Sequence, residues 1–113
     1  MLRADQHRVR HILDAAREAQ SFVLGKSRDD LDGNRILSLA LVRCIEIIGE
    51  AAANITEDGR AEYPAIPWRQ VIAMRNRLIH AYFDVDLDRV WDTVTDDLPP
   101  LIAALETPAV SES

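Results

Sequence analysis

Apolar residues recur at intervals of three and four along most of the chain, and this spacing predicts α-helices. The first helix should carry its apolar stripe at Val9, Ile12, Leu13, Ala16, Ala19 and Val23. Gly25 is a suitable stop, because glycine readily adopts the left-handed backbone that ends a helix. The polar segment 26–34 is then predicted to be a loop.

A second helix is predicted over residues 34–55, and apolar residues cover most of its circumference. Its polar residues form a narrow stripe at Arg35, Arg43, Glu46, Glu50 and Asn54. A helix with so little polar surface is usually central in a bundle, or is covered by a second chain. In a domain of this size, the pattern favours a homodimer.

The second half of the chain predicts two longer helices and one short one. Gly59 and Pro64 indicate a turn over residues 56–66, and Pro67 suits the first turn of a third helix that should end near Tyr82. Asp84 and Asp86 lie where the N-cap of a fourth helix is expected. Pro99 and Pro100 should interrupt that helix and open a short last one over 101–105.

No segment alternates with a period of two, so strands are not expected. The predicted fold is all-α, an antiparallel helical bundle of four to five helices. Residues 1–106 should form a single helical domain, and residues 107–113 a disordered C-terminal tail.

Composition narrows the class of protein and its compartment. The 113 residues are 48% hydrophobic and 28% charged, which is typical of one soluble globular domain. Cys44 is the only cysteine, so no disulfide can form within the chain. No apolar run is long enough to span a bilayer, and no secretory signal is visible, so we expect a cytoplasmic protein without a membrane partner.

The charge is unevenly distributed. The net charge of −6 argues against a protein that holds long nucleic acid by bulk electrostatics. Residues 67–82, however, contain three arginines and no acid, whereas residues 83–98 contain six aspartates and one arginine. A local site could therefore bind an anion that the whole surface would repel.

The segment 75–82 contains the residue types needed for RNA cleavage. Arg75 offers a planar fork that can grip a phosphate at two points, and His80 can accept or donate a proton near neutral pH. Attack by the internal 2′-hydroxyl of RNA requires proton transfer and positive charge beside the phosphorane. No metal and no cofactor are required.

Helix geometry complicates this assignment. On an ideal helix Arg75 shares a face with Tyr82, while Asn76 shares the next face with His80. Arg75 and His80 would converge only through a distorted helix end or through the same helix of a second protomer. These polar residues could instead form salt bridges, for example with Asp84, Asp86 and Asp88, and Tyr82 could be an ordinary core aromatic.

Other candidate sites are weaker. His7 and His11 have a spacing that can hold a metal on a helix, but an exposed solvated face is favoured. Glu46 and Glu50 could form an acid–base pair, although a structural ion pair between Arg43 and Glu46 is the better explanation. Cys44 is expected in the core, both tryptophans are expected to anchor packing, and the aspartates after Phe83 are expected to be caps or solvated surface rather than a cation site.

The chain resembles the HEPN domains, specifically the HepT-like toxins. Arg75, His80 and Tyr82 match the Arg-x4-His-x-Tyr pattern of that family. The surrounding sequence is also similar, at Ile-Gly-Glu-Ala 48–51, Tyr63-Pro64, Ile66-Pro67-Trp68, Met74-Arg75-Asn76, Tyr82-Phe83, Val90-Trp91 and Asp97-Leu98-Pro99. The resemblance spans about residues 5–105.

The resemblance implies a homodimeric, HEPN-like bundle that acts as the toxin of a type VII toxin–antitoxin pair. Its activity would be a metal-independent endoribonuclease, with Arg75 and His80 catalytic and Asn76 supporting them. The partner would be a small nucleotidyltransferase antitoxin that neutralises the toxin by adding AMP to Tyr82. The alternative is a non-catalytic helical dimer that binds a nucleotide or a partner protein.

Overall fold

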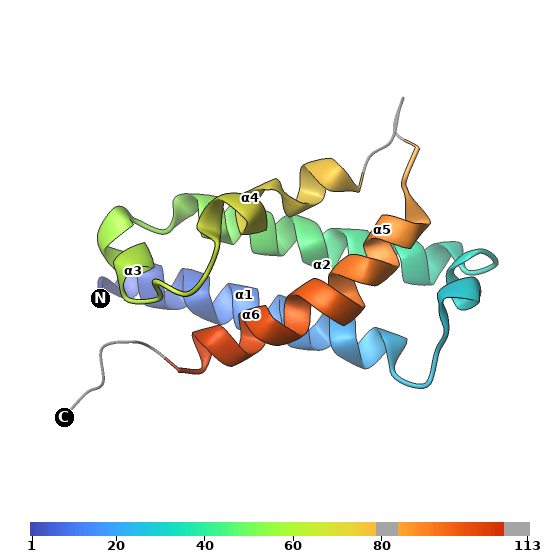
Figure 1. Ribbon diagram of the computed structural model, residues 1–113, viewed down its shortest axis with the longest axis horizontal. Coiled ribbons are helices and arrows are strands. Elements are labelled where there is room, and N and C mark those ends of the chain that lie inside the picture. Colours follow the sequence, from blue (N-terminus) through green and yellow to red (C-terminus); the bar gives the residue numbers. More distant parts are fainter. Residues whose placement is uncertain (79–83, 108–113) are drawn as a thin grey trace.

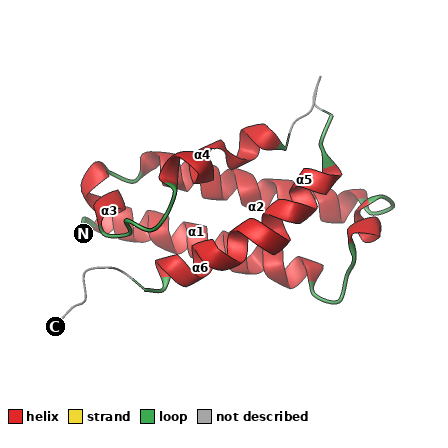
Figure 2. Ribbon diagram, in the orientation of Figure 1, coloured by secondary structure: helices red, strands yellow, loops and turns green. Residues whose placement is uncertain are grey.

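The computed structural model describes residues 1–78 and 84–107 of the chain, and the elements in them are helical. The α-helices are α1 (Arg3–Val23), α2 (Arg35–Asn54), α3 (Glu57–Ala61), α4 (Trp68–Arg77), α5 (Leu87–Asp92) and α6 (Leu98–Leu105). The longer helices lie side by side in alternating directions and form an antiparallel bundle (Figure 1). Figure 2 shows helix and loop but no strand among the coloured residues. The predicted all-α class is confirmed.

Helix α2 is the centre of the bundle. It packs against α1, α4 and α5, and its buried side chains are Leu37, Leu41, Cys44, Ile45, Ile48, Ala51 and Ala52. The chain itself therefore covers most of the apolar circumference that suggested a dimer. Ile36 and Leu39, near the start of α2, stay 83% and 51% exposed. Dimerisation remains a prediction that rests on less apolar surface than the sequence suggested.

The first helix and its stop agree with the sequence pattern. Helix α1 ends at Val23, and Gly25 has a φ of 75°, the left-handed conformation expected of a glycine there. The predicted loop contains one short 3₁₀ turn, η1 (Arg28–Leu31). Ser27 and Asp30 cap this turn reciprocally, and the turn buries Leu31 against the core.

The predicted turn over 56–66 contains an additional short helix, α3. Thr56 caps α3 by accepting a hydrogen bond from the Gly59 N–H at 3.1 Å. The buried carboxylate of Asp5, on α1, in turn accepts from the Thr56 N–H at 3.0 Å and from its hydroxyl at 2.5 Å. The sequence did not reveal this helix because its cap is completed by a residue fifty-one positions away.

Helix α4 ends earlier than predicted. It runs from Trp68 to Arg77, and the Leu78 carbonyl accepts a hydrogen bond from the Asp86 N–H at 2.7 Å. The helical-wheel argument, which placed Arg75 with Tyr82 and Asn76 with His80, assumed a helix through residue 82. The described helix ends at Arg77, and the wheel positions of His80 and Tyr82 lie outside the described residues.

The prolines do not interrupt the last helical rod. Asp86 caps α5 by accepting from the Arg89 N–H at 3.1 Å, as predicted, and α5 continues through a π-helical turn, η2 (Thr93–Asp97), into α6. Pro99 and Pro100 lie in the first turn of α6, where a missing N–H costs little. The π turn directly before them accommodates the change of hydrogen-bond register.

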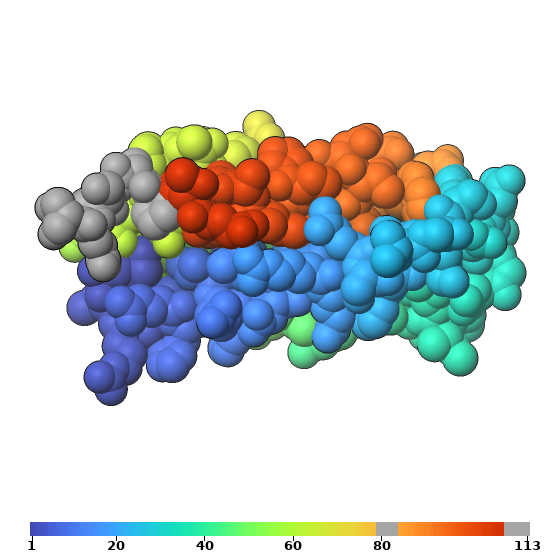
Figure 3. Space-filling view, turned by 90° about the horizontal axis from the view of Figure 1, so that it is seen from below, coloured from blue at the N-terminus to red at the C-terminus, as the bar shows by residue number. Residues whose placement is uncertain are grey.

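The α5–α6 rod completes the bundle against α1. Figure 3 shows α1, in blue, lying along this rod, in orange and red, and the two are in contact. In the described part of the chain, no helix combines the length and the apolar character that crossing a membrane requires. Except for Thr107, the predicted C-terminal tail lies outside the described residues.

Candidate functional site

Arg75 lies on the surface, in the last turn of α4, where α4 crosses α2. Its side chain is 55% exposed, and its Nε donates to Glu46 Oε2 at 3.1 Å. One alternative from the sequence paired Arg75 with the aspartates after Phe83, and Glu46 was expected to pair with Arg43. The structure contradicts both pairings: Glu46 comes from the neighbouring helix and pairs with Arg75, while Asp88 pairs with Arg28 at 2.6 Å.

Gly49 determines how closely α4 approaches α2. A Cβ atom added at Gly49 would lie 3.3 Å from the carbonyl oxygen of Ile72, so a larger residue would push the two backbones apart. Ile72 is one turn before Arg75 on α4, and Glu46 is one turn before Gly49 on α2. The glycine therefore places the guanidinium of Arg75 within hydrogen-bond distance of Glu46.

The crossing of α2 and α4 leaves a surface hollow of about 460 Å³, here called the Arg75 hollow. It is lined by Arg43, Glu46, Gly49, Glu50, Ala53, Ile72, Arg75 and Asn76. Arg75 and Asn76 therefore open onto the same hollow, which combines two guanidiniums, an amide and two carboxylates. Because the hollow is open to solvent, a phosphate group could reach Arg75 and compete with Glu46.

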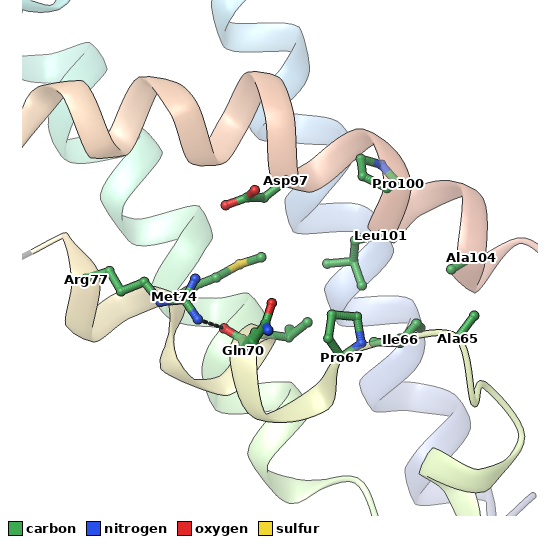
Figure 4. Close-up of a pocket in the computed structure, with 11 residues that line it drawn as sticks. Ala65, Ile66, Pro67, Gln70, Met74, Arg77, Asp97, Pro100, Leu101 and Ala104 are labelled. Carbon is green, nitrogen blue, oxygen red and sulfur yellow. Dashed lines mark hydrogen bonds between the residues drawn. The ribbon is translucent and has the colours of Figure 1, made fainter.

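Arg77 lies on a different surface although it is only two residues further along α4. Its Nη2 donates to the Gln70 carbonyl at 3.3 Å, and it lines a groove between α4 and α6 with Asp97 and Pro100 (Figure 4). Of the two arginines in the last turn of α4, only Arg75 lines the Arg75 hollow.

His80 and Tyr82, the predicted proton-transfer and modification residues, lie outside the described residues. The structure therefore brings together Arg75 and Asn76 from the predicted site. It adds Glu46, which had been considered only as a partner of Arg43 or Glu50, and Arg43, which had been considered only as a partner of Glu46. Spacing within α2 could not identify these roles, because they depend on which face of α2 meets α4.

The remaining candidate residues have the roles that the sequence favoured. Cys44 is buried, and burial, reinforced by the Glu18 carboxylate, raises the pKa of its thiol to about 11. Trp68 and Trp91 are half-buried against the core, and the Trp68 indole donates to the Arg60 carbonyl at 3.2 Å. His7 and His11 are exposed on α1. Within residues 1–78 and 84–107, no three histidine, cysteine or acidic side chains form a group that could hold a metal ion.

Comparison with known proteins connects this chain to a family. The model of the family described as HepT-like, ribonuclease HepT-like, matches residues 12–107. A protein of Thermococcus cleftensis named "Probable ribonuclease HepT" is 37% identical over 94% of this chain and 96% of its own length. No solved structure matches the chain.

Two further relatives carry similar names. A protein of Methanocaldococcus jannaschii, provisionally named an RNase, is 34% identical over 84% of this chain and 87% of its own length. Another provisionally named RNase, from Caldanaerobacter subterraneus, is 36% identical over 80% of this chain and 81% of its own length. The family match and these relatives extend over nearly the whole described bundle, and the chain therefore belongs to the HepT-like ribonuclease family.

Proposed function

We propose that this chain is a metal-independent endoribonuclease that acts as the toxin of a toxin–antitoxin pair. The observation that supports it most directly is the exposed Arg75 guanidinium in an open hollow, beside Asn76 and in contact with a single carboxylate among the described residues. The family supplies the substrate class, because a ribonuclease acts on RNA. Arg75 would bind the scissile phosphate in place of Glu46.

The proposed reaction is attack by the 2′-hydroxyl on the adjacent phosphorus. The new O–P bond forms as the bond from phosphorus to the 5′-oxygen breaks, leaving a 2′,3′-cyclic phosphate and a 5′-hydroxyl. His80 takes the 2′-hydroxyl proton or returns a proton to the leaving oxygen, and Arg75 stabilises the negative charge of the phosphorane. Asn76 helps to orient the phosphate from the same hollow. In the sequence, His80 follows Leu78 by two residues.

A homodimer would supply a second copy of the same residues. One imidazole cannot be both base and acid in a single step, so two sites related by a two-fold axis would allow the two histidines to share these tasks. The exposed Ile36 and Leu39 offer apolar surface for such contact. The dimer is part of the proposal.

The antitoxin half of the proposal concerns Tyr82. A nucleotidyltransferase would join the phenolic oxygen of Tyr82 to the α-phosphorus of ATP and release pyrophosphate. The added AMP would place negative charge and bulk two residues from His80, where they would repel an RNA phosphate. Replacing Tyr82 by Phe should leave cleavage intact but prevent neutralisation by the antitoxin.

The test compares purified wild type with Arg75→Ala, His80→Ala and the control Arg77→Ala, on RNA with and without a chelator. We expect Arg75→Ala to lower cleavage by about 10²–10³-fold, as loss of a transition-state charge contact does. Arg77→Ala should cleave normally because Arg77 lies on another surface. The products should carry 2′,3′-cyclic phosphates. Intact RNA with the wild type would refute the nuclease proposal and favour the non-catalytic binding module. Cleavage only without chelator would refute the metal-independent mechanism.

A further inference from the structure

A second hollow lies beside the Arg75 hollow, and it is formed by residues of α1 and α2. This α1–α2 hollow, of about 480 Å³, has His7, Arg8, His11, Arg43, Glu50 and Asn54 as its polar lining. Arg43 and Glu50 line both hollows. Because these two residues are seven apart on α2, the two hollows adjoin along about 10 Å of the helix.

The lining of the α1–α2 hollow contains two arginines, Arg8 and Arg43, and one carboxylate, Glu50, although the protein as a whole is acidic. The carboxylate nearest to Arg8 in the sequence is Asp5. Asp5 is only 1% exposed, and both its oxygens are occupied by Thr56. Its negative charge is therefore withdrawn from the surface, apart from a 3.9 Å contact with Arg8.

Arg43 is a suitable anion contact between the two hollows. It is exposed, and among the described residues it has no salt-bridge partner, because Glu46 is engaged by Arg75. Arg43 lies one helical turn before Glu46 on α2, so an anion that displaces Glu46 from Arg75 would have a second guanidinium nearby. This arrangement suits a ligand with several phosphates in a row.

The chemistry of the α1–α2 hollow is that of a site for single-stranded RNA. Arginines contact phosphates, imidazole rings can stack on unpaired bases, and an amide such as that of Asn54 can bond a base edge. His7 and His11 are four residues apart and therefore lie on one face of α1. Among the described residues, no third histidine, cysteine or acidic side chain joins His7 and His11 in a group that could hold a metal ion.

We propose that the α1–α2 hollow binds nucleotides that neighbour the scissile phosphate on the same RNA strand. Arg43 bridges the two hollows by contacting a phosphate between them, and His7 and His11 hold the adjoining base or phosphate. This inference rests on the proposed nuclease function for the position of the cut, but not for the binding itself. Binding in the α1–α2 hollow would make the enzyme prefer a strand of several nucleotides to a dinucleotide.

The first experiment measures binding alone. A fluorescent 2′-O-methyl octanucleotide, whose blocked 2′-oxygen cannot attack, is titrated by anisotropy into the wild type, His7→Gln/His11→Gln, Arg43→Gln and Arg10→Gln. Arg10 is the matched control because it is an exposed arginine on α1 that lines a different hollow, with Tyr63 and Leu105. Far-UV circular dichroism and urea midpoints verify that each variant is folded.

We expect the double histidine variant to bind about fivefold more weakly, the loss of one stacked base. Arg43→Gln should also weaken binding and should lower the slope of log affinity against log salt by about 0.7, one phosphate contact on a single strand. Arg10→Gln should bind like the wild type. Equal affinities for all three variants, or no binding by the wild type, would overturn the proposal.

The second experiment separates this proposal from the nuclease proposal. The double histidine variant should lower kcat/KM about fivefold on an octanucleotide and leave cleavage of a dinucleotide unchanged, because the dinucleotide does not reach the α1–α2 hollow. An equal loss on both substrates would mean that the histidines act on the cut itself, and would overturn the inference. If the wild type cleaves neither substrate, the nuclease proposal fails, and the anisotropy comparison still decides the binding site.

Discussion

Two carboxylates in this molecule, Asp5 and Glu46, each hold a group from a neighbouring segment, but in opposite surroundings. Asp5 is buried at the corner where α1 meets the start of α3, and both its oxygens accept hydrogen bonds from Thr56. Glu46 is 31% exposed at the edge of the Arg75 hollow and contacts one arginine. The first arrangement is closed to solvent, and the second is open to it.

The difference teaches which contacts stabilise the fold and which can serve a ligand. A buried carboxylate must keep its hydrogen bonds, because losing them leaves an unsolvated charge. An exposed ion pair can separate at little cost, because water and ions replace the partner. Asp5 is therefore expected to act on stability, and Glu46 on the availability of Arg75.

Replacement of Asp5 by Ala should give the largest loss of stability. It removes a buried side chain that accepts two hydrogen bonds from Thr56, at a cost of about 3 kcal/mol in the free energy of unfolding. Urea denaturation followed by circular dichroism measures this loss. The control is Asp14→Ala, an exposed aspartate on the same helix, which should change stability by less than about 0.5 kcal/mol. Equal effects of the two variants would show that burial does not distinguish them.

Gly59→Ala should crowd the same corner. A Cβ atom at Gly59 would lie 2.6 Å from Asp5 Oδ2 and 2.8 Å from Ile55 Cγ2, so either α3 or the carboxylate must move. We expect destabilisation of about 2 kcal/mol, typical of overpacking. Gly33→Ala is the matched control, because nothing lies within 4 Å of a Cβ atom there. Thermal unfolding of the two variants gives the comparison, and an unchanged Gly59→Ala protein would contradict it.

Lowering the pH should remove the contribution of Asp5 to the stability of the fold. The hydroxyl and the N–H of Thr56 donate to the carboxylate and hold the pKa of Asp5 below its usual 3.8, although burial opposes them. The folded state thus binds this proton less readily than the unfolded chain, so the stabilisation is complete above pH 3.8 and is lost as the pH falls through the lower folded-state value.

The measurement compares the wild type with Asp5→Asn, which cannot titrate at this position. The difference in the free energy of unfolding should amount to about 1–2 kcal/mol near neutral pH and should narrow in acid. A difference that stays constant from neutral pH into the acid range would show that the charge of Asp5 is not what Thr56 stabilises.

Hydrophobic period, caps and turn residues predicted most of the bundle because these signals are local. The apolar stripe and the end of α1, the bounds of α2, the left-handed Gly25 and the Asp86 cap all follow from residues within a few positions of one another. Local signals did not predict three other features: helix α3, the end of α4 at Arg77 and the uninterrupted α5–α6 rod. Each depends on a distant partner or on a π turn that the sequence pattern does not show.

The candidate site likewise contains residues that the sequence identified and residues that it did not. Arg75 and Asn76 were identified by residue type and by family resemblance, and both line the Arg75 hollow, while their roles in cleavage stay a prediction. The Glu46–Arg75 pair and the position of Arg43 could not be found from the sequence, because they depend on how closely α4 crosses α2. Gly49 allows that crossing, yet in the sequence it is only a glycine within an apolar helix.

Replacement of Glu46 by Gln should give the smallest change in stability and thereby sharpen the contrast with Asp5. The exposed pair contributes little, so the free energy of unfolding should fall by no more than about 0.5 kcal/mol. The variant frees the Arg75 guanidinium and removes a negative charge from the hollow, so affinity for a 2′-O-methyl octanucleotide should rise by about threefold. Glu50→Gln is the matched control for removing one negative charge from the same hollow without releasing Arg75, and it should raise affinity less. Weaker binding by Glu46→Gln would mean that Glu46 orients Arg75 for the phosphate rather than competing with it.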